Sequence, residues 1–88
     1  METNENVAQG IRTYLAENFL FTDEGFPYGD DESFMELGVV DSLGIAELLA
    51  FVEEEFGIAV DDHELVPDNF DSVEKLSGFV TRKQAMSA

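Results

Sequence analysis

The strongest constraint on the fold is a run of apolar residues at helical spacing in the middle of the chain: Ile45, Leu48, Leu49, Val52 and Phe56. Such a stripe predicts a helix of about four turns that buries one face. Gly57 suits the end of this helix, because glycine readily adopts the left-handed conformation of a C-cap. We therefore expect a helix over Ser42–Phe56, with Asp41 or Ser42 as its N-cap.

Three further segments show helical patterns, at about residues 5–19, 62–66 and 72–82. Asn4 is the expected N-cap of the first segment, and Asp61 or Asp62 that of the second, which Pro67 should stop. Residues 71–74 have the form of a capping box with Glu74 at N3. Because no run alternates as a strand does, we predict an all-α fold, a small bundle of three main helices plus one short helix. We expect a single domain over residues 1–88, ordered from about 5 to 83.

A long first loop, over residues 22–40, separates the first two main helices. A loop of this length is uncommon unless it is functional or tied down, and one helical turn at residues 33–36 would fit the pattern. Its acidic run, Asp30, Asp31 and Glu32, is either a solvated charge run, which we favour, or a divalent-cation site. The alternating ligands and central glycine of a calcium loop are missing.

Charge dominates the composition, since 20 Asp and Glu residues face 4 Lys and Arg residues, for a formal net charge of −16. No Lys or Arg lies between Arg12 and Lys75. The negative sign excludes nucleic-acid binding by phosphate neutralisation and favours protein partners with basic patches.

The chain has no cysteine, and no apolar run reaches the roughly 18 residues of a membrane-spanning helix. Its N-terminus is acidic and polar, unlike a signal peptide. We therefore expect a cytoplasmic monomer that does not enter a membrane.

Catalytic groups are scarce. The chain has one histidine, His63, which we expect to be an exposed or capping residue. Val40 stands two positions before Ser42, where a nucleophile elbow requires glycine. A serine without a base is a weak nucleophile, so we predict no catalytic activity of the chain's own and no metal site.

The stretch Gly38-Val39-Val40-Asp41-Ser42-Leu43 resembles the attachment site of the acyl carrier protein family. The resemblance implies that Ser42 carries 4′-phosphopantetheine, taken from coenzyme A, through a phosphodiester. It also implies that Asp41 helps to present the serine and a metal ion to the modifying enzyme. The alternative is that the serine is only a helix cap. In either case we expect Ser42→Ala to remove a cap worth about 1 kcal/mol.

The spacing within this stretch resembles one branch of the family more than another. Fatty-acid carriers commonly have one residue between the glycine and the aspartate, whereas Val39 and Val40 make two here. Many peptidyl, D-alanyl and free-standing aminoacyl carriers have two. Gly44 stands where the fatty-acid type often has aspartate. The resemblance therefore favours a discrete, specialised carrier.

The outer side of the predicted middle helix carries Leu43, Glu47, Ala50 and Glu54, flanked by Glu53. The resemblance implies that this face docks onto the phosphopantetheinyl transferase, onto an acyl- or aminoacyl-activating ligase and onto a downstream synthase or transferase. A purely solvated face is the alternative. Competing functions are an unmodified acidic adaptor for basic partners and, less favoured, an acidic inhibitor or metal-binding module. The sequence assigns no role to Phe51.

Overall fold

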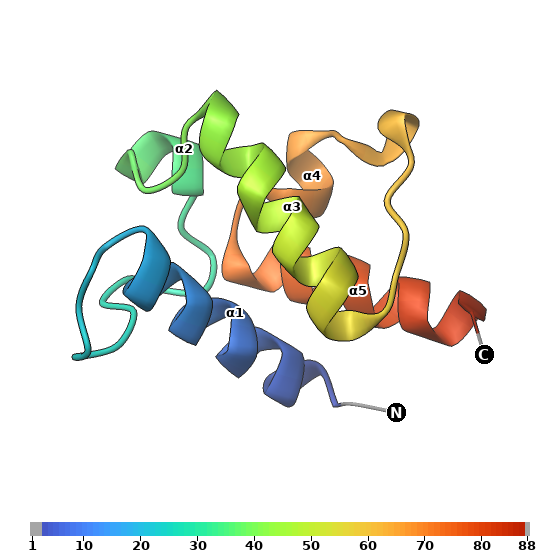
Figure 1. Cartoon of the computed structure of the whole chain (residues 1–88), viewed down its shortest axis with the longest axis horizontal. Helices are drawn as coiled ribbons and strands as arrows, with labels where there is room; N and C mark the ends of the chain where they lie inside the picture. The colour runs from blue at the N-terminus through green and yellow to red at the C-terminus, as the bar shows by residue number, and fades with distance from the viewer. Residues whose placement is uncertain (1–2, 88) are drawn as a thin grey trace.

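The computed structural model describes residues 3–87, which form helices and loops with no strand in that range (Figure 1). In chain order the elements are α1 (Asn4–Asn18), α2 (Phe34–Leu37), α3 (Ser42–Phe56), the 3₁₀ turn η1 (Asp62–Glu64), α4 (Pro67–Phe70) and α5 (Val73–Ser87). The predicted all-α bundle of three main helices is confirmed, and so are the bounds of α3. None of the helices in this part of the chain is long and apolar enough to cross a bilayer.

The three long helices enclose the hydrophobic core. In Figure 1, α1 runs opposite to α3 and α5, and α2 lies at the end of the bundle where α3 begins. Their buried side chains are Val7, Ile11, Leu15, Leu48, Val52, Phe56, Val73, Leu76, Phe79 and Val80. Ile45, expected in the buried stripe of α3, is only half-buried and packs against the edge of this core.

The start of α1 corrects one expected cap. Thr3 is the N-cap, because its Oγ1 accepts a hydrogen bond from the Asn6 N–H at 3.1 Å, whereas Asn4 is already helical. Gly10 has a packing role inside this helix. A Cβ atom there would lie 3.3 Å from Cζ of Phe56, so glycine allows the phenyl ring of α3 to pack closely against α1.

The connection from α3 to α4 follows the expected pattern only in part. Gly57 ends α3 with a left-handed φ of 68°, as predicted. The next short helix stops at Glu64 instead of near residue 66, and the Asp61 N–H donates to Oε1 of Glu64 at 3.0 Å, which settles the cap as Asp61. Pro67 does not merely stop a helix but opens α4, because its fixed φ and missing N–H suit a first helical position.

The predicted capping box at α5 is wrong. Ser72 is the cap, since its Oγ accepts the Lys75 N–H at 3.0 Å, so Glu74 does not occupy N3. The helix also continues past residue 82 to Ser87. Two contacts hold its last turns: Gln84 Nε2 donates to the Phe56 carbonyl at 3.2 Å, and Lys83 Nζ lies 2.9 Å from Oε1 of Glu64.

Asp71, expected in that box, instead fixes the long first loop. Its Oδ1 accepts the Met35 N–H at 3.1 Å, and its Oδ2 accepts the Ser33 hydroxyl at 2.5 Å. Its carbonyl accepts the Phe34 N–H at 3.0 Å, and the Phe34 ring is buried in the core. The loop that leads to Ser42 is therefore tied to the N-terminal end of α5.

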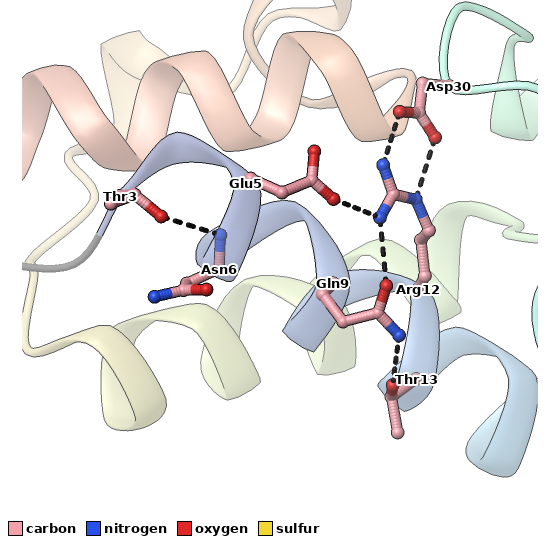
Figure 2. A network of polar contacts seen from close by, with 7 residues as sticks. All are labelled: Thr3, Glu5, Asn6, Gln9, Arg12, Thr13 and Asp30. Atoms are coloured by element: carbon pink, nitrogen blue, oxygen red, sulfur yellow. Dashed lines mark hydrogen bonds and ion pairs between the residues drawn. The ribbon is translucent and has the colours of Figure 1, made fainter.

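Arg12 fixes the same loop to α1 (Figure 2). Its Nε and one terminal nitrogen donate to the two carboxylate oxygens of Asp30, at 2.9 and 2.5 Å, and the other terminal nitrogen lies 3.0 Å from Oε2 of Glu5. The hydrogen bonds from Arg12 lower the pKa of Asp30. Asp30 is therefore paired, and the favoured solvated charge run is wrong for this residue. Within residues 3–87, no cluster of three or more His, Cys, Asp or Glu side chains is arranged to hold a metal ion.

We predict that Asp30→Asn lowers the free energy of unfolding at pH 7 by about 1 kcal/mol, a value limited by the partial exposure of this pair. The folded-state pKa of Asp30 lies below its unfolded value of about 4, so the pair stabilises the fold above that value. The stabilisation is lost as the pH falls through the lower, folded-state pKa. The deficit should therefore be largest at pH 7 and shrink below pH 4. Urea unfolding at several pH values measures it, with exposed Asp31→Asn as the control. A deficit that stays constant down to pH 2.5 would contradict the assignment.

Candidate functional site

The structure shows which of Asp41 and Ser42 is the N-cap of α3, a choice that the sequence left open. Asp41 is the N-cap: its Oδ1 accepts the Gly44 N–H at 2.7 Å, and its carbonyl accepts the Ile45 N–H at 2.9 Å. Ser42 is the first helical residue, and its side chain is exposed. Ser42→Ala therefore removes no cap, and the expected reason for its stability cost is wrong.

The residues before Asp41 hold this helix start in place. Gly38 ends α2 in the left-handed conformation, with φ 73°, which glycine adopts without a steric penalty. The N–H groups of Val39 and Val40 both donate to the Phe34 carbonyl, at 3.0 and 3.4 Å. Val40 is buried in the core, so the two-residue spacing between Gly38 and Asp41 is fixed by packing as well as by hydrogen bonds.

Gly44 owes its identity to close packing against the end of α1. A Cβ atom on Gly44 would lie 2.7 Å from Cε2 of Phe19 and 3.2 Å from the capping oxygen of Asp41. Any larger side chain would have to displace the Phe19 ring, the cap or both. The glycine that distinguishes this stretch from the fatty-acid pattern is therefore required by the local structure.

The outer face of α3 is exposed for most of its predicted length. Leu43, Glu47, Ala50 and Glu54 are all solvent-accessible, and Leu43 is 81% exposed. Glu53 differs from them, because it is half-buried and its Oε2 accepts the Val60 N–H at 2.8 Å. The structure thus brings four of the five expected docking residues to one open surface and gives the fifth a contact within the fold.

Phe51, which had no assigned role, stacks on Tyr14 with ring centroids 3.9 Å apart and meets Phe56 edge-on at 5.9 Å. Partial burial and then the charge of Glu47 raise the pKa of Tyr14. Beside this stack lies a groove of about 460 Å³ between α1 and α3, lined by Tyr14, Glu47, Ala50, Phe51, Glu54 and Glu55.

His63 is exposed, in line with one of its two expected roles.

Phe21, an exposed residue near the site, was not identified by the sequence analysis. Phe21 is 83% exposed and has a left-handed φ of 54°, a conformation that costs a bulky residue about 1–3 kcal/mol. Two hydrogen bonds fix the chain around it, from Leu20 N–H to the Leu15 carbonyl at 3.0 Å and from Thr22 N–H to the Ala16 carbonyl at 2.9 Å. The only signal in the sequence is that three apolar residues in succession follow Asn18, more than one helix face can bury.

This helix start can hold a phosphate ester on Ser42. The hydroxyl is exposed at the N-terminus of a 15-residue helix, where the helix dipole favours negative charge. The N–H groups of Ser42 and Leu43 have no acceptor within the helix because they lie in its first turn, and Asp41 accepts the N–H of Gly44, not either of theirs. These donors and the exposed hydroxyl are therefore compatible with a phosphodiester on Ser42.

We predict that, in the unmodified chain, Asp41→Ala lowers the free energy of unfolding by about 1 kcal/mol because it removes the capping oxygen. Ser42→Ala should change it by less than about 0.5 kcal/mol, as expected for an exposed side chain. Urea denaturation of both variants beside the wild type measures the difference. Equal losses would mean that the serine hydroxyl shares in the cap.

Comparison with known proteins agrees with this geometry. A search of curated proteins finds no match. The sequence model of one protein family, described as "Phosphopantetheine attachment site", matches residues 9–80, from the first half of α1 into α5. The match covers most of the chain and includes the whole of α2 and α3. The chain therefore belongs to the phosphopantetheine attachment-site family, and its prosthetic group is 4′-phosphopantetheine.

Proposed function

We propose that Ser42 carries the prosthetic group and that the protein is a discrete acyl or aminoacyl carrier. The observation that supports the proposal is that Asp41 caps the start of α3 while the Ser42 side chain stays exposed. The family match supports a carrier protein in general. The attachment residue and the kind of cargo are our inference.

The chain's own residues position the reaction but do not catalyse it. Asp41 holds the first turn of α3, so that the Ser42 hydroxyl is presented outward. A phosphopantetheinyl transferase with Mg²⁺ supplies the base that takes the hydroxyl proton. The serine oxygen then bonds to the pantetheine-side phosphorus of the coenzyme A diphosphate, the P–O bond from that phosphorus to the adenosine-side phosphate breaks, and adenosine 3′,5′-bisphosphate leaves. Once bound, the prosthetic group supplies the thiol that holds a thioester for partner enzymes.

A specialised carrier fits the local structure better than bulk fatty-acid synthesis does. The two-residue spacing of Val39 and Val40 and the glycine at 44 are both fixed by packing. The spacing matches that of many peptidyl, D-alanyl and free-standing aminoacyl carriers, and from it we infer a carrier that serves a dedicated acyl- or aminoacyl-activating ligase. We further propose that residues 1–88 act as a single monomeric domain in the cytoplasm, without catalytic activity.

We predict that incubation with coenzyme A, Mg²⁺ and a broad-specificity phosphopantetheinyl transferase adds about 340 Da, the mass of the phosphopantetheine group. Ser42→Ala should abolish the addition, because it removes the only atom that forms the new bond. Intact-protein mass spectrometry measures both. A wild-type chain that stays at its sequence mass would favour the unmodified adaptor. An Ala variant that still gains mass would place the attachment elsewhere.

The exposed face of α3 supports a docking role for Leu43, Glu47, Ala50 and Glu54, with Glu53 at its edge. A partner that reaches Ser42 must approach this end of α3, and the face offers one large apolar side chain, Leu43, among carboxylates. Rim charges mainly raise the association rate and are screened by salt, whereas a buried apolar contact slows dissociation. Because Glu53 already accepts the Val60 N–H, we assign the charge contacts chiefly to Glu47 and Glu54.

We predict that Glu47→Lys and Glu54→Lys each slow loading by about three- to tenfold at low salt, with a loss that shrinks as salt rises. Leu43→Ala should slow loading with little salt dependence. Steady-state loading rates at about 0.02 and 0.3 M NaCl separate the two effects. Glu36→Lys, which changes an exposed glutamate on α2, is the matched control. Wild-type rates for both α3 variants would mean that this face is only a solvated surface.

A further inference from the structure

Two large apolar side chains lie exposed beside the start of α3 and line the same groove. Phe21 is 83% exposed, and Leu43 is 81% exposed. The groove has a volume of about 330 Å³, and Phe19 forms part of its lining. Phe21 belongs to the loop after α1, whereas Leu43 belongs to the first turn of α3, so the fold brings them together from separate elements.

Phe21 has a backbone conformation that bulky residues disfavour, and its ring is exposed to solvent. Its φ of 54° lies in the left-handed region, which bulky residues rarely adopt. The flanking N–H groups of Leu20 and Thr22 are bonded to carbonyls of α1, so the turn itself is well fixed. A ring that is almost fully exposed gains little from the isolated fold. Strained backbone conformations cluster at active sites, ligand clamps and switch regions, so the outlier at Phe21 points to a functional role for the exposed ring.

The charges around the groove indicate what that contact is. Asp41 and Glu47 are in the lining, and no Lys or Arg is among the lining residues. Asp23 and Glu24, which follow Phe21, are exposed carboxylates as well. A second copy of a chain with a net charge of −16 would bring like charges together at this surface. A partner with an apolar pocket bordered by Lys and Arg is complementary to it.

We propose that Phe21 and Leu43 form a paired apolar anchor for the phosphopantetheinyl transferase, whose basic residues face Asp41 and Glu47. The inference rests on the proposed function, since a transferase that modifies Ser42 must cover the start of α3. It adds a second anchor point, on the loop after α1, to the docking face on α3. Phe21 acts by positioning the carrier on the enzyme and takes no part in the chemistry.

Phe21→Gly tests this assignment with two opposite readouts. Glycine adopts the left-handed conformation freely, so the variant should keep or raise the Tm. Loss of the ring should lower kcat/KM for loading by about tenfold, with little dependence on salt. Leu43→Ala should have a similar effect. The double variant should lose less than the product of the two single losses, because both side chains enter one pocket. Met86→Ala, which removes another exposed apolar side chain at the far end of α5, is the control and should load like the wild type (Figure 1).

The outcomes distinguish this inference from the proposed function. Loading of Phe21→Gly at the wild-type rate would overturn the anchor while leaving the carrier function intact. A Phe21→Gly variant that melts at a lower temperature and also loads more slowly would make Phe21 a support of the fold and would overturn the anchor as well. A wild-type chain that forms dimers in sedimentation, and loses them with Phe21→Gly, would assign the groove to a second copy. Failure of the wild type to gain mass at all would overturn the proposed function, and the anchor with it.

Discussion

The attachment of the long first loop to the N-terminal end of α5 is the constraint on which the rest of the site depends. The only regular secondary structure between α1 and α3 is the single turn of α2. Burial of Phe34 and three hydrogen bonds to Asp71 fix that turn. Val39 and Val40 then bond back to the Phe34 carbonyl, and α3 begins directly after them. The place of the Ser42 hydroxyl is therefore set by contacts with residues about 30 positions later in the sequence.

A large excess of negative charge governs how the remaining surface is used. Four Lys and Arg residues stand against 20 Asp and Glu residues, and two of the four, Arg12 and Lys83, join separate parts of the fold through ion pairs. Arg12 joins α1 to the first loop through Asp30, and Lys83 joins the last turns of α5 to η1 through Glu64. The hydrogen bonds from the Asp61 N–H and then Lys83 lower the pKa of Glu64. Among residues 3–87, neither Glu47 nor Glu54 on the outer face of α3 forms an ion pair with Lys or Arg, which suits an encounter with a basic enzyme.

Aromatic packing around the start of α3 explains why small residues are needed there. Phe19 approaches Gly44 so closely that a Cβ atom would clash, and Phe56 approaches Gly10 less closely, leaving a tight but not clashing contact for a Cβ atom at the other end of the α1–α3 contact. The Tyr14–Phe51 stack fills the space between these two points. The two helices are thus joined largely through rings, with glycines where the rings meet backbone. Phe21 is the ring that this packing leaves outside.

Local pattern by itself determined the three long helices, the bounds of α3, the cap at Gly57 and the family signature around Ser42, because each depends on residues within a few turns of one another. It also identified the exposed face of α3, since the face opposite a buried stripe follows from helical geometry. At the start of each long helix two neighbouring polar residues could serve as the N-cap, and only the tertiary structure shows which one does. Thr3 caps α1 in place of Asn4, Ser72 caps α5, and Asp41 leaves Ser42 exposed. The carboxylate of Asp71 accepts a hydrogen bond from Met35 in α2 and does not cap α5. The left-handed conformation of Phe21 is set by hydrogen bonds from its neighbours to α1. Such contacts join residues that no local pattern relates, so only the folded chain decided them.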